Sequence, residues 1–228
     1  MRVHIDIETI PQQPEDSAKE LIAKEIKAPA AMKKQETIDD WHSGAGKYAY
    51  VKDKAIEDKY RATSFDASKG QICSIAFAVD DDDIISYSSD AGCDGDLLQD
   101  FFDDLDHRMS GKAPFFIGHY IAGFDLKFIF HRSVINGIRP PFKLPFNGRH
   151  DQDFYDNMIA WSGFKDRISQ DDLCRALGIE GKPGDINGSK VWDFYKAGGI
   201  KKIDEYNRDD VEKSRLIYKR INFISEIS

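Results

Sequence analysis

The sequence predicts an α/β fold in which helices flank a mixed β-sheet, and two patterns support this prediction. Short apolar stretches rich in β-branched residues occur at 3–7, 71–79 and 114–118, and stretches with apolar residues at helical spacing follow them. Strands that alternate with helices are typical of a sheet covered by helices. Because 41% of the 228 residues are hydrophobic, the chain can fill one core, and we expect a single domain over residues 1–228.

The first predicted strand, 3–7, ends before Pro11, and a polar stretch at about 12–68 follows it. We expect this stretch to be an insertion of helices and loops laid over the core. It is either a solvated helical excursion or an arm that guides substrate.

The remaining elements follow in order. Two antiparallel strands are expected at 71–79 and 84–87, and the four aspartates 80–83 between them are typical of a solvated hairpin tip. Helical spacing predicts helices over 96–109 and 124–135, on either side of the apolar strand 114–118. From 151 onward the chain is predicted to be mostly helical: Ser169 caps one helix that stops at Gly178, and the last two helices span 189–197 and 200–224.

Composition argues against some classes of binding partner and cellular location. The formal net charge of −8 argues against a protein that grips long duplex DNA through its phosphates alone. Three widely spaced cysteines fit neither a disulfide framework nor a zinc site, so we expect a reducing, cytoplasmic location. No apolar run approaches the roughly 20 residues that cross a bilayer, and the N-terminus lacks a signal-peptide pattern, so no membrane partner is expected.

Acidic residues recur at three places where a fold could bring them together. Asp6 and Glu8 lie two residues apart on a strand, so both side chains project from one face, while Ile5 and Ile7 point into the core. Two like charges this close are costly unless a cation lies between them. Asp125 lies near the start of a predicted helix, where the dipole favours a carboxylate.

The third place is in the last predicted helix. Tyr206 and Asp210 are four residues apart and lie on one face, next to an apolar stripe that includes Val211 and Ile217. Asp209 points elsewhere and is predicted to be a surface acid. Each of these patterns alone is common in proteins without a site; their order along one chain is specific.

The sequence resembles the DEDDy branch of the DEDD exonucleases in the order of three motifs. These are Asp6 with Glu8, then Asp125 in a Phe-Asp pair, then Tyr206 and Asp210 in Tyr-x-x-x-Asp. Residues 26–34, 131–141 and 188–192 resemble the predicted exonucleases related to the proofreading domain of B-family DNA polymerases. One departure is Tyr120, where many relatives have asparagine.

The resemblance implies a ribonuclease H-like fold and a metal-dependent 3′→5′ exonuclease that releases nucleoside 5′-monophosphates from single-stranded DNA by a two-metal-ion mechanism. It implies that two divalent cations, Mg²⁺ or Mn²⁺, are held by Asp6, Glu8, Asp125 and Asp210, and that Tyr206 orients the attacking water. Any proofreading role would need a polymerase or another replication or repair partner encoded elsewhere.

Three aromatic side chains are predicted to contact substrate: His119, Tyr120 and Phe124 could stack on terminal bases, although core packing is also typical of Phe124. For His4 and His119 we also expect packing or supporting roles. Two other functions stay open at this point: an exoribonuclease, because the acids do not sense a 2′-hydroxyl, and a nucleic-acid-binding module without turnover.

Overall fold

A five-stranded mixed sheet forms the centre of the part of the chain that the computed structural model describes, residues 1–44, 48–180 and 186–224. Its order is β3-β2-β1-β4-β5, with bounds Arg2–Ile10 (β1), Gln71–Val79 (β2), Ile85–Ser88 (β3), Phe115–Gly118 (β4) and Phe154–Asp156 (β5). The central strand β1 is antiparallel to β2 and parallel to β4, and β4 is parallel to β5. The predicted mixed sheet is therefore confirmed.

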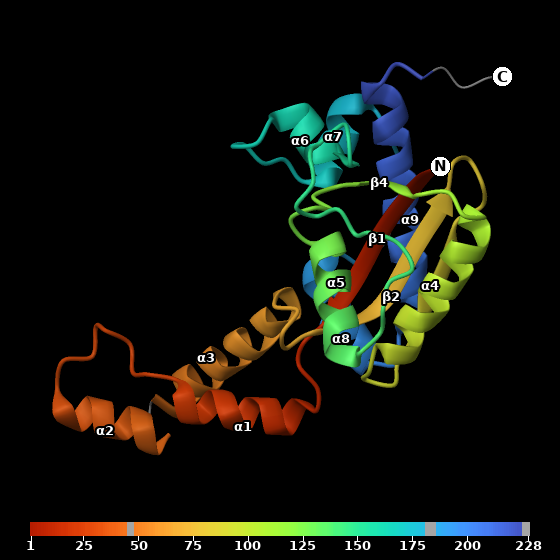
Figure 1. Ribbon diagram of the computed structural model, residues 1–228. Coiled ribbons are helices and arrows are strands. Elements are labelled where there is room, and N and C mark those ends of the chain that lie inside the picture. Colours follow the sequence, from red (N-terminus) through yellow and green to blue (C-terminus); the bar gives the residue numbers. More distant parts are fainter. Residues whose placement is uncertain (45–47, 181–185, 225–228) are drawn as a thin grey trace.

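Helices cover both faces of this sheet (Figure 1). Helices α4 and α5 lie on one face, and the long helix α9 crosses the other. The helical bounds are Glu15–Glu25 (α1), Gln35–Ser43 (α2), Ala49–Ala62 (α3), Thr63–Phe65 (η2), Gly95–Met109 (α4), Asp125–Asn136 (α5), Asn157–Ser162 (α6), Gln170–Leu177 (α7), Gly188–Lys190 (η3), Val191–Lys196 (α8) and Ile200–Ile221 (α9).

Alternation along β1 separates the core from the face that carries the acids. Val3, Ile5 and Ile7 are buried in the main core cluster with apolar residues of α4 and α5. The residues between them point to the opposite face, toward α9, where the ring of His4 contacts Tyr218 at a centroid distance of 5.6 Å. The predicted orientation of Ile5 and Ile7 is confirmed, and it directs Asp6 and Glu8 toward α9.

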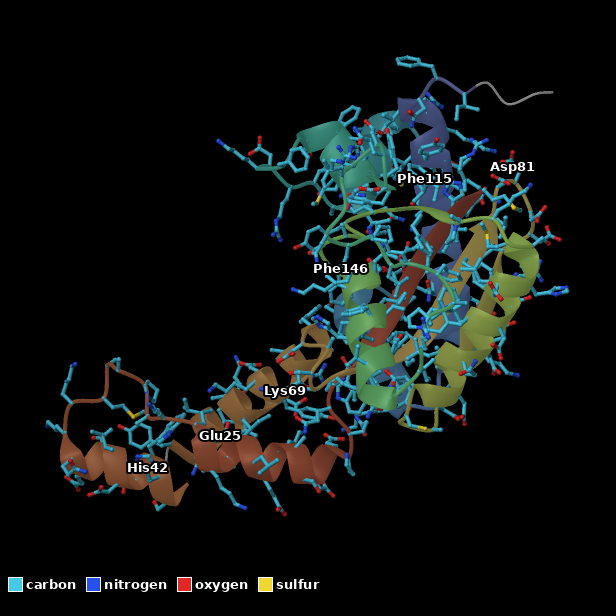
Figure 2. The ribbon with its side chains drawn as sticks, in the orientation of Figure 1. Glu25, His42, Lys69, Asp81, Phe115 and Phe146 are labelled. Atoms are coloured by element: carbon cyan, nitrogen blue, oxygen red, sulfur yellow. The ribbon has the colours of Figure 1, made fainter. Side chains whose placement is uncertain are left out.

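The stretch between β1 and β2 does not lie over the core as expected. Helices α1 to α3 project away from the sheet, and His42 of α2 lies in the outer part of this projection (Figure 2). Helices α1 and α3 pack against each other, and η2 returns the chain to β1. The polar sequence of these helices is consistent with this exposure, because few apolar residues are available to pack on the sheet.

Other boundaries differ in detail from the sequence prediction. Strand β5 was not predicted, since three residues are too few to display the strand alternation. Helix α6 lies within the stretch from 151 onward that was predicted to be mostly helical. The predicted helix 189–197 is a 3₁₀ turn followed by α8, and the last helix ends at Ile221. The aspartates 81–83 are exposed at the hairpin tip, as predicted.

Among the described residues, no helix combines the length and apolarity that membrane crossing requires.

A buried ion pair joins three elements around the core. Asp94, fully buried before α4, accepts hydrogen bonds from Arg132 Nε at 2.7 Å and Nη2 at 2.9 Å. It also accepts from Asn136 Nδ2 at 2.8 Å and from the backbone N–H of Ile72 at 3.0 Å. This one carboxylate therefore ties the start of β2 and the start of α4 to the end of α5.

We expect Asp94→Ala to lower the free energy of unfolding by about 3–5 kcal/mol, because the buried Arg132 guanidinium would lose its counter-charge. Urea denaturation followed by circular dichroism measures this loss. Asp100→Ala, on the exposed face of α4, is the matched control and should change stability by less than about 0.5 kcal/mol. Equal stability of the two variants would contradict the structural role of Asp94.

Candidate active site

Strand β1 and helix α9 bring three acids together. The carboxylates of Asp6, Glu8 and Asp210 each have an oxygen within 4.8 Å of the others. Asp6 and Glu8 share the α9 side of β1, and Asp210 reaches them from the middle of α9, where Val211 is buried against the sheet. The predicted convergence of the first and third motifs is therefore present in the structure.

Asp125 joins this group through the backbone of β1. Its Oδ1 accepts a hydrogen bond of 3.1 Å from the N–H of Ile7, the residue between Asp6 and Glu8, and its side chain is buried. Asp125 is also the first residue of α5, where the helix dipole favours negative charge. The second motif thus lies beside the first because a β1 amide and a helix N-terminus both hold its carboxylate.

Burial and mutual repulsion dominate the electrostatics of the cluster. Burial raises the pKa of Asp6 well above its usual range, and the charges of Asp125, Asp210 and Glu8 raise it further. The pKa of Glu8 is raised in the same way, first by burial and then by Asp210 and Asp125. Burial also raises the pKa of Asp125 to about 7, even though two backbone hydrogen bonds favour its ionised form. Without a bound cation, these carboxyl groups therefore keep their protons to higher pH than free carboxyl groups do.

Tyr206 lies one turn before Asp210 on α9 and donates its hydroxyl hydrogen to the Asp210 carboxylate. Burial raises the pKa of Tyr206 well above its usual range, and the charges of Asp210 and Glu8 raise it further. The hydroxyl therefore stays protonated at neutral pH, which makes it a hydrogen-bond donor and a poor general base.

Lys213 supplies a positive charge that sequence reasoning missed. Its side chain is buried, and Nζ lies 3.2 Å from Asp210 Oδ1 and 3.0 Å from Asp209 Oδ2. The prediction that Asp209 is a surface acid is wrong, because its carboxylate lies against this ammonium group with only 12% of the side chain exposed. The three-residue spacing between Asp210 and Lys213 was the available signal, since such residues are neighbours on a helix.

The turn between β4 and α5 carries the predicted substrate contacts. Tyr120 has a φ of +63°, a left-handed conformation that is uncommon outside glycine, and its N–H donates to Asp156 Oδ1 at 2.9 Å. The Arg167 guanidinium lies 4.9 Å from the centre of the Tyr120 ring. His119 Nε2 lies 2.9 Å from the Ile168 carbonyl oxygen, to which it donates. The turn thus flanks the acid cluster, and Phe124 directly precedes Asp125.

Asp156 is a second residue that the sequence did not reveal. It is fully buried at the end of β5, and its Oδ1 also accepts from the backbone N–H groups of Met158 and Ile159. Its charge adds to the effect of burial in raising the pKa of Asp125. Because β5 itself was not predicted, no pattern indicated that Asp156 would lie beside the β4 turn.

The donor set fits divalent cations. Each acid offers carboxylate oxygens, which are the ligands that Mg²⁺ and Mn²⁺ prefer. The carboxylates of Asp6, Glu8 and Asp210 are close enough to share one ion. Burial first, and then the neighbouring carboxylates, raise the pKa values of Asp6 and Glu8, and a bound cation would offset both effects.

Comparison with known proteins identifies the family of this chain. Residues 67–227 match the family model described as "Predicted 3'-5' exonuclease related to the exonuclease domain of PolB". The chain belongs to this family. As a member, it is a predicted 3′→5′ exonuclease, and hence a hydrolase that acts on nucleic acid. The matched segment includes Asp125, Tyr206 and Asp210, whereas Asp6 and Glu8 precede it.

A solved structure supports the fold over nearly the whole exonuclease chain. The family B DNA polymerase from the hyperthermophilic archaeon Pyrobaculum calidifontis aligns with a TM-score of 0.56 and 13% sequence identity, covering 96% of this chain and 24% of the polymerase. The chain thus spans about a quarter of that protein, and at this identity the likeness concerns the fold. It confirms the expected ribonuclease H-like class. The search of curated proteins found no match.

The raised carboxyl pKa values predict how stability depends on pH when divalent cations are absent. Asp125 ionises at about 7 in the folded exonuclease but near 3.8 in the unfolded chain, so the folded state binds more protons between these values. The stability it contributes is fully present below pH 3.8 and is lost as pH rises through 7. The slope is at most about 1.4 kcal/mol per pH unit for each such proton.

Urea denaturation with chelator at pH 5, 6, 7 and 8 tests this dependence, and we expect stability to fall across the series. Asp125→Asn removes one titrating carboxyl and should make the fall less steep. Excess Mg²⁺ should also reduce the fall by offsetting the repulsion among the ionised acids. A wild-type stability that rises steadily over this range in chelator would contradict the electrostatic description of the cluster.

Proposed function

We propose that the chain is a metal-dependent 3′→5′ exonuclease of the DEDDy type that removes nucleotides from the 3′ end of single-stranded DNA and releases nucleoside 5′-monophosphates. The convergence of Asp6, Glu8, Asp125 and Asp210 beside Tyr206 supports this proposal above all. On this proposal the whole chain, 1–228, acts as one exonuclease unit, with 12–68 as an insertion.

The proposed mechanism assigns a task to each group. Asp6, Glu8 and Asp210 would hold the divalent cations, Mg²⁺ or Mn²⁺, together with Asp125. When bound, two such ions supply an activated water and stabilise the leaving oxygen. Tyr206 donates its hydroxyl hydrogen to Asp210 and would orient the attacking water through its hydroxyl oxygen, while Lys213 holds the Asp210 carboxylate in place. Cleavage of the bond to the 3′ oxygen leaves the phosphate on the released nucleotide.

The proposed substrate follows from charge and from the site. A formal net charge of −8 disfavours tight binding along a duplex, whereas one 3′ end needs only local contacts. His119, Tyr120 and Phe124 on the β4–α5 turn are the proposed substrate contacts. A role in proofreading would require a polymerase or another replication or repair partner.

Digestion of matched 5′-labelled single-stranded DNA and RNA, with Mg²⁺, Mn²⁺ or chelator, tests the proposal. We expect a ladder that shortens from the 3′ end, depends on metal and proceeds faster on DNA. Asp6→Ala and Asp210→Ala should abolish it without unfolding the protein, because each removes a proposed metal ligand. Asp106→Asn, an exposed acid on α4, is the matched control and should digest like wild type.

Each other outcome of this digestion is informative. Faster shortening of RNA would identify an exoribonuclease. Binding of the strands without shortening in either metal would identify a module without turnover and contradict the proposal. Near-normal activity in both alanine variants would contradict the assignment of the acids.

Tyr206→Phe tests the role of the hydroxyl separately. It keeps the ring and removes the hydrogen bond to Asp210. We expect kcat to fall about 10–100-fold, because the attacking water loses an orienting group, while KM stays within about twofold. A change in KM alone would assign the tyrosine to substrate binding instead.

A further inference from the structure

The projecting segment, α1 to α3, is followed by η2, which returns the chain to the site. Hydrogen bonds hold η2 against the end of β1. The Thr9 hydroxyl, directly after Glu8, donates to the Ser64 carbonyl oxygen at 2.8 Å, and the N–H of Gln12 donates to Thr63 Oγ1 at 2.9 Å. These contacts fix the position of Thr63–Phe65 relative to the acid cluster. In Figure 2, Lys69, four residues beyond this turn, lies where the projection joins the sheet.

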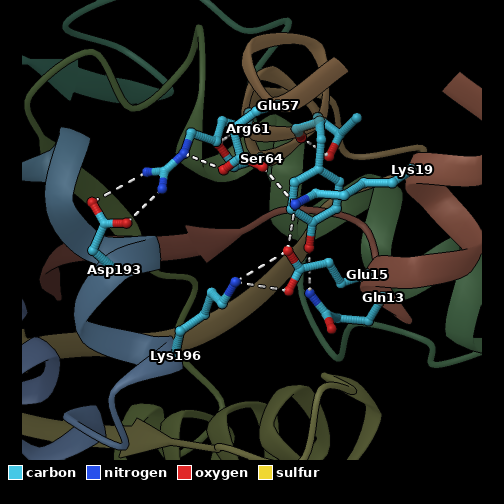
Figure 3. Close-up of polar contacts among 10 residues, drawn as sticks. Gln13, Glu15, Lys19, Glu57, Arg61, Ser64, Asp193 and Lys196 are labelled. Carbon is cyan, nitrogen blue, oxygen red and sulfur yellow. Dashed lines mark hydrogen bonds and ion pairs between the residues drawn. The ribbon is translucent and has the colours of Figure 1, made fainter. Parts of the chain in front are cut away.

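A polar network holds the helix that precedes η2 (Figure 3). Arg61, near the end of α3, donates to both carboxylate oxygens of Asp193 on α8, at 2.5 and 3.2 Å, and its Nε donates to Glu57 at 2.7 Å. Lys19 of α1 lies within 2.6 Å of both Glu57 and Glu15. Such exposed pairs stabilise little individually. Together they orient α3 against α1 and α8.

The rigidly held turn presents an exposed aromatic ring. The Phe65 side chain is 70% exposed and lies 6.3 Å from the Phe124 ring, centre to centre, at an angle of 57°. Phe124 in turn contacts Phe128 at 5.3 Å. Covering this exposed ring with a ligand would remove apolar surface from water, which is favourable. Its neighbour Phe124 directly precedes Asp125.

A cavity of about 200 Å³ lies between η2 and the start of α5. Phe65, Phe124 and Phe128 line it, together with Lys127 and His131, which are four residues apart and share one face of α5. Asp66 also lines it, but its carboxylate accepts hydrogen bonds from the N–H and hydroxyl of Ser68. The cavity therefore combines aromatic walls with a cationic side chain and an imidazole.

We propose that this cavity is a binding subsite for one nucleobase of the single strand, and that Phe65 of the segment joining β1 to β2 forms its outer wall. The proposal rests on the exonuclease function above and extends it. Aromatic rings stack on any base, and the ammonium group of Lys127 can neutralise an adjacent phosphate. The projecting segment thereby contributes to substrate binding through the turn at its base.

Strand binding tests this subsite independently of turnover when every protein carries Asp210→Ala. Fluorescence anisotropy with Mg²⁺ compares Phe65→Ala with the parent on 5′-labelled single-stranded DNA. We expect Phe65→Ala to weaken binding about tenfold, and Phe65→Trp to bind like the parent, because tryptophan also stacks. Tyr50→Ala is the matched control: Tyr50 is a 76% exposed aromatic residue of α3, and its loss should change binding less than twofold.

Strands with one abasic nucleotide at the first, second or third position from the 3′ end separate base stacking from other effects. At one of these positions we expect the parent and Phe65→Ala to bind equally well, because the base that Phe65 contacts is missing. No effect of Phe65→Ala on intact DNA, or an equal loss on the intact strand and all three abasic strands, would overturn the proposal.

The two proposals fail in different ways. Digestion by the wild-type protein with no effect of Phe65→Ala on binding would overturn the subsite and leave the exonuclease function standing. If binding of the intact strand depends on Phe65 but wild type does not digest it, the exonuclease function would be overturned and the subsite would stand. Absence of both strand binding and digestion would overturn both.

Discussion

The rest of this structure depends on one electrostatic constraint: four carboxylates lie together beneath the surface at the end of β1. Each buried charge costs several kcal/mol in lost hydration, and each carboxylate also repels the others. The raised pKa values of Asp6, Glu8 and Asp125 express this cost. The surroundings offset only part of it, through the Ile7 amide that binds Asp125 and the ammonium group of Lys213 beside Asp210.

The buried carboxylate of Asp94 shows what is needed to offset the cost of burying a charge. Asp94 is as buried as any of the acids, but it accepts hydrogen bonds from two Arg132 nitrogens, from Asn136 and from the Ile72 amide. Asp6 and Glu8 face other carboxylates instead. Paired acids hold a fold together, whereas a group of acids with insufficient donors is poised to bind a cation. The contrast within one chain supports a functional interpretation of the cluster.

Much of the site could be predicted because its residues obey local geometry. Two-residue spacing on a strand placed Asp6 with Glu8, and four-residue spacing on a helix placed Tyr206 with Asp210. Local geometry could not place Asp209, because Lys213 and the packing of α9 decide its surroundings. It also could not detect β5, since three residues carry no readable period and their pairing with β4 is a long-range contact.

The sequence by itself determined the class of fold, the order of the acidic motifs, the shared strand face of Asp6 and Glu8, and the shared helix face of Tyr206 and Asp210. These follow from residue type and short-range periodicity. Only the tertiary structure decided that the Ile7 amide holds Asp125, that Asp156 supports the β4 turn and that η2 brings Phe65 opposite Phe124. These are contacts between segments far apart along the chain. They depend on how the elements pack in three dimensions, and no local pattern of residues encodes that packing.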